Sequence, residues 1–377
     1  MRTLCTVGAL LVTATGLIAC GGSDPEPTAE AASPAAVIKV REDALASARV
    51  WTTPAIPIPE ANLGENPPGP GAFAADAEVA CRFTLDEVSG LTPKFHCELP
   101  DHSVVKVKYG SGNPELPGEV AATRLLTALG FGADRMYVVK RVQCAGCPSH
   151  PFYALRCLQE VGVKSACLPG GVDYNEVVSF DAAVIERRLE GRKIEAPPNH
   201  VGWAWFELTK VDATRGGASR AELDALRLMA VFLAHWDNKS ENQRLLCPPD
   251  ADRPDGSCVR PLAILQDVGA TFGPSKMDIH NWRNTQIWAD GRSCTVSMKS
   301  LPWNGATFPD WKISEDGRLL LLGLLDQLSD QQVRDLFEGS RIAALDQLSA
   351  EGRHVDNWVR VFRDKIEQIR KAGPCGR

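Results

Sequence analysis

Several polar side chains lie close together in the stretch "HWDNKSEN", directly after a run of helical character. Asp237 and Asn242 are five residues apart, with His235 two residues before the aspartate and Lys239 two residues after it. Asp267 follows later, at the end of the apolar run "AILQ". A carboxylate can accept the proton of an attacking hydroxyl group, and carboxylate and amide oxygens are ligands that Mg²⁺ prefers. These residue types therefore predict a proton acceptor beside a metal site.

Two kinds of element must position these side chains. The first half reads as short strands, "CRFTLDEV", "KFHCEL" and "SVVKVKY", followed by a helix in "PELPGEVAATRLLTALGFG". The second half reads as helices. The segment "ASRAELDALRLMAVFLAHW" opens with Ser219 and has Glu222 three residues later, which is a capping box, and at least two more helices are expected in the tail. The pattern predicts an α+β chain with a strand-rich lobe and a helical lobe.

The spacing of the polar cluster resembles the H-R-D-x-x-x-x-N catalytic loop of the protein-kinase-like superfamily, with a tryptophan in place of the arginine. The downstream "QDVG" resembles the D-F-G motif of the same superfamily. The resemblance implies that Asp237 is the catalytic base, that His235 is in register with the motif and that Lys239 lies near the transferred phosphate. It also implies that Asn242 and Asp267 hold Mg²⁺, or Mn²⁺, on ATP or a related nucleotide.

A loop for the nucleotide phosphates is expected in the strand-rich half. The segment "SGLTPKF" joins two predicted strands and lacks the G-x-G-x-x-G pattern of ordinary protein kinases. It resembles the shorter G-x-x-x-K loop of HipA-like kinases. That resemblance places Gly90, Thr92 and Lys94 on the phosphates.

A lysine for the α- and β-phosphates is expected in "SVVKVKY". Lys106 and Lys108 share one face of this predicted strand, so both could reach the ligand. Alignment with the V-A-I-K motif favours Lys106 and leaves Lys108 as the alternative. Glu119, near the start of the following helix, is the expected ion-pair partner of this lysine, with Glu115 as the second choice.

The nucleotide base is expected to bind where the two lobes join. Residues 202–212, "GWAWFELTKVD", read as an apolar strand between the halves. The resemblance makes "FELTKV" at 206–211 the interlobe connection, in which backbone groups at Glu207 and Leu208 would read the base. The resulting expectation is a two-lobed protein-kinase-like fold, with an N-lobe over 79–211 and a C-lobe over 212–377. It is closest to HipA-like and other atypical, phosphoinositide-kinase-like kinases.

The N-terminus has the features of an export signal. One arginine precedes an apolar run that is shorter than a membrane span, which predicts a signal peptide over residues 1–19. The segment "LIAC" resembles the bacterial lipobox, which implies lipidation of Cys20 and, with Gly21 next, an outer-membrane lipoprotein of the cell envelope. Residues 20–78 are rich in Pro, Gly and Ala and predict a linker with a short helix-like piece at 36–51, so the folded body is expected to begin near Val79.

The predicted export allows the role of the cysteines to be interpreted. Of twelve cysteines, Cys5 falls in the signal and Cys20 takes lipid, and an even number remains for disulfides in an oxidising compartment. The spacings suggest the pairs Cys81/Cys97, Cys144/Cys147, Cys157/Cys167, Cys247/Cys258 and Cys294/Cys375. Spacing alone does not fix the connectivity. The motif "CAGC" at 144–147 is also compatible with a redox or metal half-site.

The composition limits the kinds of partner that the chain is expected to bind. The net charge is −6, the pI is about 5.7 and both signs are mixed along the chain, without the basic tract that nucleic-acid binding requires. No segment after the signal reaches the length of a membrane span. We therefore expect a globular body that contacts the membrane only through its lipid anchor.

The predicted function is that of an exported atypical kinase. It would transfer a phosphoryl group, or alternatively a nucleotidyl group, to a hydroxyl of a protein, sugar or lipid. Because ATP is scarce outside the bacterial inner membrane, the alternative is a catalytically silent kinase-like binding lipoprotein. A third possibility, an envelope scaffold, predicts no nucleotide binding. The base and two metal-site residues favour the kinase.

Overall fold

The computed structural model describes residues 33–110, 112–273, 276–299, 306–345 and 348–376. Residues from Pro34 onward belong to one compact unit. The predicted signal peptide and Cys20 lie outside the described residues, so export and lipidation stay predictions. In the described part of the chain, no helix is long and apolar enough to cross a membrane.

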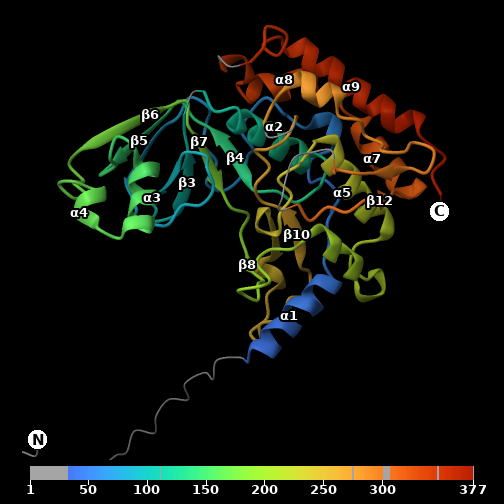
Figure 1. Ribbon diagram of the computed structural model, residues 1–377, viewed down its shortest axis with the longest axis horizontal. Helices are drawn as coiled ribbons and strands as arrows, with labels where there is room; N and C mark the ends of the chain where they lie inside the picture. The colour runs from blue at the N-terminus through green and yellow to red at the C-terminus, as the bar shows by residue number, and fades with distance from the viewer. Residues whose placement is uncertain (1–32, 111, 274–275, 300–305, 346–347, 377) are drawn as a thin grey trace, which may run out of the picture. The chain divides into compact units, whose positions relative to one another are not determined.

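The strand-rich half forms a seven-stranded sheet with the order β4-β7-β3-β2-β1-β5-β6 (Figure 1). Its strands are β1 Glu78–Phe83, β2 Lys94–Glu98, β3 Val104–Lys108, β4 Arg135–Val138, β5 Arg141–Ala145, β6 Val177–Asp181 and β7 Val184–Arg187. Neighbouring strands are antiparallel except β1 and β5, which are parallel. The three strands predicted before the first helix are present as β1, β2 and β3.

The two faces of this sheet have different coverings. One face carries Phe95 and Val107 and is covered by α3, Pro151–Val161, which is followed by the short α4, Lys164–Cys167. The other face packs against α2, Glu115–Ala128, through a small apolar cluster that includes Val120. Because successive side chains of a strand point to opposite faces, the lysines of β2 and β3 lie on the α2 side of the sheet.

The second half is mainly helical. Its helices are α5 Arg220–Phe232, α6 Ile279–Asn284, α7 Glu315–Leu325, α8 Asp330–Gly339 and α9 Val355–Lys371. A three-stranded sheet, β10-β9-β8, lies beside them, with β8 Arg192–Lys193, β9 Gln243–Cys247 and β10 Leu262–Leu265, and β11 Thr295–Val296 pairs with β12 Trp311–Lys312. The predicted capping box of α5 forms between Ser219 and Glu222. The predicted α+β chain with a strand-rich half and a helical half is confirmed.

The expected domain limits are wrong in two places. Helix α1 spans Pro34–Ala46, and side chains in the predicted linker, such as Ile58 and Leu63, are buried in the core of the helical half. Burial of apolar side chains on one continuous core makes this segment part of the folded body. The large sheet ends at Arg187 and β8 already pairs with β9. The connection between the halves is therefore 188–191 rather than a point near 211.

All five cysteine pairs suggested by the sequence are disulfides. The bonds join Cys81–Cys97, Cys144–Cys147, Cys157–Cys167, Cys247–Cys258 and Cys294–Cys375. The predicted disulfide framework is confirmed. Such a framework is typical of proteins that mature in an oxidising compartment.

Candidate active site

The end of α5 delivers the polar cluster to the site. The chain leaves the helix through Ala234, which has a left-handed backbone (φ 53°), and the backbone N–H of His235 donates to the carbonyl of Ala230 at 2.9 Å. The His235 side chain is fully buried, and this burial lowers its pKa to about 4. His235 cannot contact a substrate, so its assignment to the catalytic residues is wrong. The ring supports the loop from inside as a neutral imidazole.

Asp237 lies half-buried at the surface of the loop. Burial raises the pKa of its carboxyl, and the positive charge of Lys239, whose Nζ is 3.5 Å from Oδ2, partly offsets this. Its Oδ1 is buried and has no hydrogen-bond partner among the described residues. The Asn242 side-chain amide donates to the Asp237 carbonyl at 2.7 Å, which fixes the loop across the predicted motif. Asp237 is thus held in place with a free acceptor atom.

Asp267 joins this loop from β10. Its backbone N–H donates to the carbonyl of Asn242 at 3.2 Å, so the two predicted metal ligands are tied together through the main chain. Burial opposes ionisation of the Asp267 carboxyl, but the charges of Lys108 and Lys94 hold its pKa below the ordinary value. No hydrogen bond from a described residue reaches this carboxylate. A carboxylate that is ionised and free of donors is the state a hard cation requires.

A buried ion pair lies above these residues. The Lys108 Nζ is 2.6 and 2.5 Å from the two carboxylate oxygens of Glu119 in α2, and 3.3 Å from Oε2 of Glu186 in β7. Burial lowers the pKa of Lys108, but Glu119 and Asp267 outweigh it and raise that pKa well above the ordinary value. Burial raises the pKa of Glu119 to about 7, against the charge of Lys108. Lys108 is therefore a permanently charged cation buried between the sheet and α2.

The preference for Lys106 as the partner of Glu119 is wrong. Lys106 Nζ instead contacts Glu186 Oε1 at 2.6 Å on the neighbouring strand. The second choice for the acid, Glu115, is engaged elsewhere, because it accepts a hydrogen bond from the hydroxyl of Thr92. The structure therefore pairs Lys108 with Glu119 and leaves Lys106 further along the strand, next to a pocket.

The β1–β2 loop covers the third lysine. Lys94 is the register partner of Lys108 and is buried, and burial together with Lys108 lowers its pKa. Among the described residues, Lys94 has no hydrogen-bond or ion-pair partner. Gly90 has a left-handed backbone (φ 74°), and a Cβ there would lie 3.3 Å from the Lys94 Nζ. The loop thus closes directly over an unpaired cation, as a phosphate-binding loop requires.

Helix α2 approaches the Asp267 segment closely. A Cβ at Gly118 would come within 2.9 Å of the carbonyl oxygen of Gly269, so only glycine permits this contact. The contact places the segment of α2 that carries Glu119 next to the segment that carries Asp267. Three lysines and three carboxylates, Lys94, Lys106, Lys108, Glu119, Glu186 and Asp267, therefore form one charged group between sheet, α2 and β10.

A pocket of about 700 Å³ adjoins this group. Lys106, Glu186 and the connection Arg188–Glu190 are among its lining residues. Asp134 fixes the connection, because its Oδ1 accepts a hydrogen bond from the backbone N–H of Leu189 at 2.7 Å and also pairs with Arg244 of β9. The segment that joins the two halves is therefore anchored from both of them.

The predicted base-reading segment is wrong. Residues Trp205–Lys210 form a 3₁₀ helix rather than a strand. Leu208 is fully buried in the core of the helical half, and Glu207 accepts hydrogen bonds from the guanidinium of Arg41 in α1 at 3.0 and 2.8 Å. Neither residue lines the pocket, so both stabilise the fold.

Some residues of the site had no signal that a single sequence could reveal. Glu186 lies 80 residues from Lys106 in the chain, and the pairing arises only because β7 inserts beside β3. Asn238, inside the catalytic-loop motif, accepts hydrogen bonds from the backbone N–H groups of Thr307 at 2.8 Å and Phe308 at 3.1 Å. Its position between His235 and Asn242 was visible, but its anchoring role was not.

Comparison with known proteins gives only distant likenesses. No family model and no curated protein matches the sequence. Among solved structures, the proinflammatory kinase CtkA of Helicobacter pylori is 10% identical, with a TM-score of 0.42 over 78% of this chain and 95% of that one. The Golgi casein kinase with Mn/ADP bound is 13% identical, with a TM-score of 0.35 over 80% and 74%. At these values neither likeness carries an argument, so the function rests on the geometry of the site.

Proposed function

We propose that the chain is a metal-dependent phosphotransferase of the protein-kinase-like type, which uses a nucleotide donor and a hydroxyl acceptor. The observation that carries the proposal is the Lys108–Glu119 ion pair, which faces an aspartate that accepts no hydrogen bond from a described residue. Asp267 is tied to the Asn242 carbonyl, and Asn242 is tied to the Asp237 carbonyl. Phosphate anchor, metal ligands and base thus belong to one connected unit.

Each residue has a defined task in this proposal. Lys108 and Lys94 neutralise the phosphates, while the loop over Gly90 covers them. Asn242 and Asp267 would hold Mg²⁺ or Mn²⁺, and the metal would neutralise the negative charge of the phosphoryl group during its transfer. Asp237, which is half-buried, accepts the proton of the attacking hydroxyl, and Lys239, 3.5 Å from its Oδ2, favours the charged form of this carboxylate.

The base of the nucleotide would bind in the pocket beside Lys106. The connection at 188–191 lines this pocket and is held by Asp134, which makes it the replacement for the segment at 206–211. The acceptor can be a protein, a sugar or a lipid. Its class distinguishes a HipA-like kinase from a phosphoinositide-kinase-like one. The five disulfides support maturation in an oxidising compartment, and Cys20 is the proposed lipid anchor at the cell envelope.

Nucleotide binding is the first experiment. ATP with Mg²⁺ should raise the Tm of the purified protein more than ATP with a chelator, because ligand that binds the native state stabilises it. Asp267→Asn should abolish the metal-dependent part of the shift. Asp356→Asn, whose side chain is 75% exposed in α9, is the matched control and should retain it. The absence of any metal-dependent shift in the wild-type protein would remove the proposed function.

Transfer is the second experiment. ATP labelled at the γ-phosphate reports phosphoryl transfer, and ATP labelled at the α-phosphate reports nucleotidyl transfer. Asp237→Asn should lower the rate by roughly 10²–10⁴-fold, the usual contribution of a general base, while the Tm shift with Mg-ATP stays. Binding without transfer of either label, in the presence of protein, sugar and lipid acceptors, would support the silent binding lipoprotein instead.

A further inference from the structure

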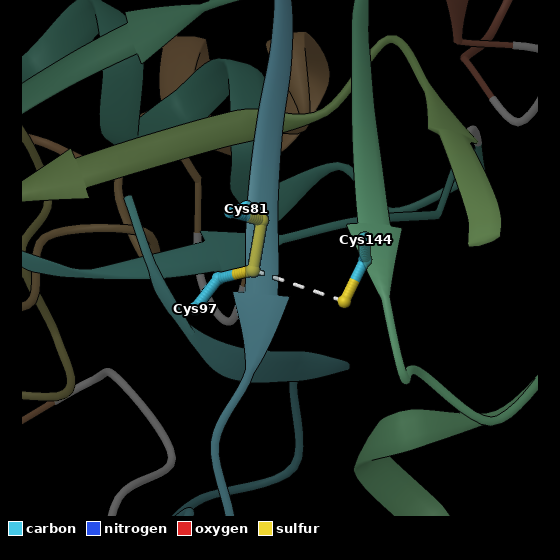
Figure 2. A group of neighbouring side chains, drawn as sticks. All are labelled: Cys81, Cys97 and Cys144. Atoms are coloured by element: carbon cyan, nitrogen blue, oxygen red, sulfur yellow. Dashed lines mark hydrogen bonds between the residues drawn. A yellow bond between two sulfur atoms is a disulfide. The ribbon is translucent and has the colours of Figure 1, made fainter. Parts of the chain in front are cut away.

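Two disulfides of the large sheet lie in contact with each other. Cys81–Cys97 joins β1 to β2, and Cys144–Cys147 closes the end of β5. The Sγ atoms of Cys97 and Cys144 are 3.7 Å apart, and those of Cys81, Cys97 and Cys144 all lie within 4.8 Å of one another (Figure 2). In the part of the chain that the structure describes, no other disulfide has a third cysteine at this range.

Strand geometry decides which sulfurs can exchange. Cys81 and Cys144 are direct register partners on the parallel strands β1 and β5. Adjacent strands lie about 4.8 Å apart, within the Cα separation of about 4.4–6.8 Å that a disulfide needs. Cys97 and Cys144 are separated by β1, as Figure 2 shows, so their Cα atoms lie at least about 9 Å apart by the same spacing. A bond between Cys81 and Cys144 is therefore possible, and one between Cys97 and Cys144 is not.

We propose that these four cysteines form one redox centre that takes electrons from an external dithiol. The dithiol attacks the Cys147 sulfur and expels the Cys144 thiolate, and its second thiol then releases Cys147 and leaves as a disulfide. The freed Cys144 side chain rotates away from Cys97, and its thiolate attacks the Cys81 sulfur in line with the Cys81–Cys97 bond, forms the Cys81–Cys144 bond and expels the Cys97 thiolate. Two electrons enter from the dithiol, and the chain ends with one disulfide and two thiols, Cys97 and Cys147.

The order of these steps follows from exposure and loop length. Cys147 and Cys81 remain 6% and 5% exposed, whereas Cys97 and Cys144 are fully buried, so a reagent can reach only one sulfur of each disulfide and loop length decides between the two bonds. The Cys144–Cys147 bond spans a separation of 3 residues and the Cys81–Cys97 bond one of 16. A shorter loop gains less from closure entropy, so the C-x-x-C bond opens first. Exchange would then release β2, which carries Lys94, from its covalent link to β1.

The direct test uses the wild-type chain. The protein is treated with one equivalent of dithiothreitol under native conditions, alkylated, digested without reduction and mapped by mass spectrometry. The expected product has Cys97 and Cys147 alkylated and a Cys81–Cys144 bond. A product with Cys144 and Cys147 alkylated and Cys81–Cys97 intact would overturn the proposal. So would a Cys81–Cys144 bond that forms only in denaturant.

Single substitutions test the strand geometry. Cys97→Ser frees Cys81 beside its register partner, so the bond should shift to Cys81–Cys144 and release Cys147, at about pH 8.5 where about half of an ordinary thiol is ionised. Cys81→Ser frees Cys97, whose sulfur is 3.7 Å from that of Cys144, and should give no Cys97–Cys144 bond. Appearance of that bond would refute the geometric argument.

A matched control lies in the helical half. Cys258→Ser frees Cys247 from a disulfide that has no third cysteine nearby. Its other disulfides should remain unchanged under the same conditions. Equal scrambling in this variant would show that exchange is general and would overturn a specific centre. All of these readouts are independent of nucleotide binding, so the redox centre can hold or fail separately from the proposed phosphotransfer.

Discussion

Asp224 in α5 is fully buried and Asp267 after β10 is partly buried, and their carboxylates are surrounded in different ways. The Asp224 carboxylate accepts hydrogen bonds from Arg227 at 2.7 Å, from Arg220 at 2.6 Å and from the backbone N–H of Ser314, at the start of α7, at 3.0 Å. Asp267 accepts none from any described residue, and distant lysines alone keep it ionised.

The difference separates a carboxylate that stabilises the fold from one that is available to a ligand. Buried polar groups are normally hydrogen-bonded, because an unpaired one costs the full loss of its hydration. Asp224 follows this rule and joins α5 to α7. The buried Oδ1 atom of Asp237 departs from it. The partly buried carboxylate of Asp267 and the buried Lys94 likewise have no hydrogen-bond partner among the described residues. Unpaired groups of both signs close together indicate a binding site for a ligand that carries both anionic and cationic groups.

The largest effect on stability is expected at Asp224. Asp224→Ala would leave Arg227, which is buried, without its partner and would free the start of α7. Removal of one member of a buried ion pair typically costs about 3–5 kcal/mol. Urea denaturation would measure the loss. The control is Asp330→Ala, whose carboxylate is 70% exposed and which should cost less than about 1 kcal/mol.

Loss of the Lys108–Glu119 ion pair should cost an amount of unfolding free energy between the costs of Asp224→Ala and Asp330→Ala. Lys108→Met would leave Glu119 and Glu186 facing each other in a buried site. Because the pKa of Glu119 is already raised to about 7, protonation relieves part of the cost, and we expect a loss of about 2–3 kcal/mol. Lys106→Met removes one of the two lysines that contact the buried Glu186 and leaves the other, so it should cost less, about 1–2 kcal/mol.

A double substitution sharpens this contrast. In a Glu119→Gln background, Lys108→Met should cost at least about 1 kcal/mol less than in the wild type, because the two residues interact directly. The cost of Lys106→Met should change less between the two backgrounds, because Lys106 is coupled to Glu119 only through the shared partners Glu186 and Lys108. Equal costs of Lys108→Met in the two backgrounds would contradict the pairing of Lys108 with Glu119.

The buried histidine should give the chain an acid-sensitive stability. The pKa of His235 is about 4 in the folded chain, against an ordinary value of 6.5. Between pH 6.5 and 4 the unfolded state binds the proton and the folded state does not, so stability falls as the pH falls. From pH 7 to pH 5 this group should cost about 2 kcal/mol. Urea denaturation of wild type and His235→Gln at both pH values would reveal it, since other groups cancel in the difference.

How much the sequence could predict depended on the distance between interacting residues along the chain. Asp237 and Asn242 share one loop and Asp267 follows β10, the second strand after it, so their proximity could be predicted, while their roles stay predictions. The capping box of α5 and the disulfides are likewise set by local spacing, apart from Cys294–Cys375. These features need little knowledge of the tertiary fold.

The errors all came from distant contacts. Lys106 and Lys108 share a strand face, and only the insertion of β7 next to β3 decides which one pairs with Glu119. The strand expected at 202–212 is replaced by a 3₁₀ helix at Trp205–Lys210, in which Glu207 is bound by Arg41, 166 residues away. A proline-rich segment looked like a linker, although Ile58 and Leu63 are buried in the core. A local sequence pattern does not reveal contacts between residues that are so far apart along the chain.

The smallest effect on the unliganded fold is expected at Asp267. Asp267→Asn removes a charge that attracts Lys108 and Lys94 but repels Glu119 and Glu186, and it breaks no hydrogen bond to a described residue. The change in unfolding free energy should stay below about 1 kcal/mol, whereas the same substitution at Asp224 should cost several times more. Denaturation of the two variants without nucleotide gives this ratio directly. If both cost the same, Asp267 is a structural carboxylate like Asp224, and its missing donors no longer indicate a ligand. If Asp267→Asn is silent in the free protein and loses only the stabilisation by Mg-ATP, the carboxylate contributes to binding and not to folding.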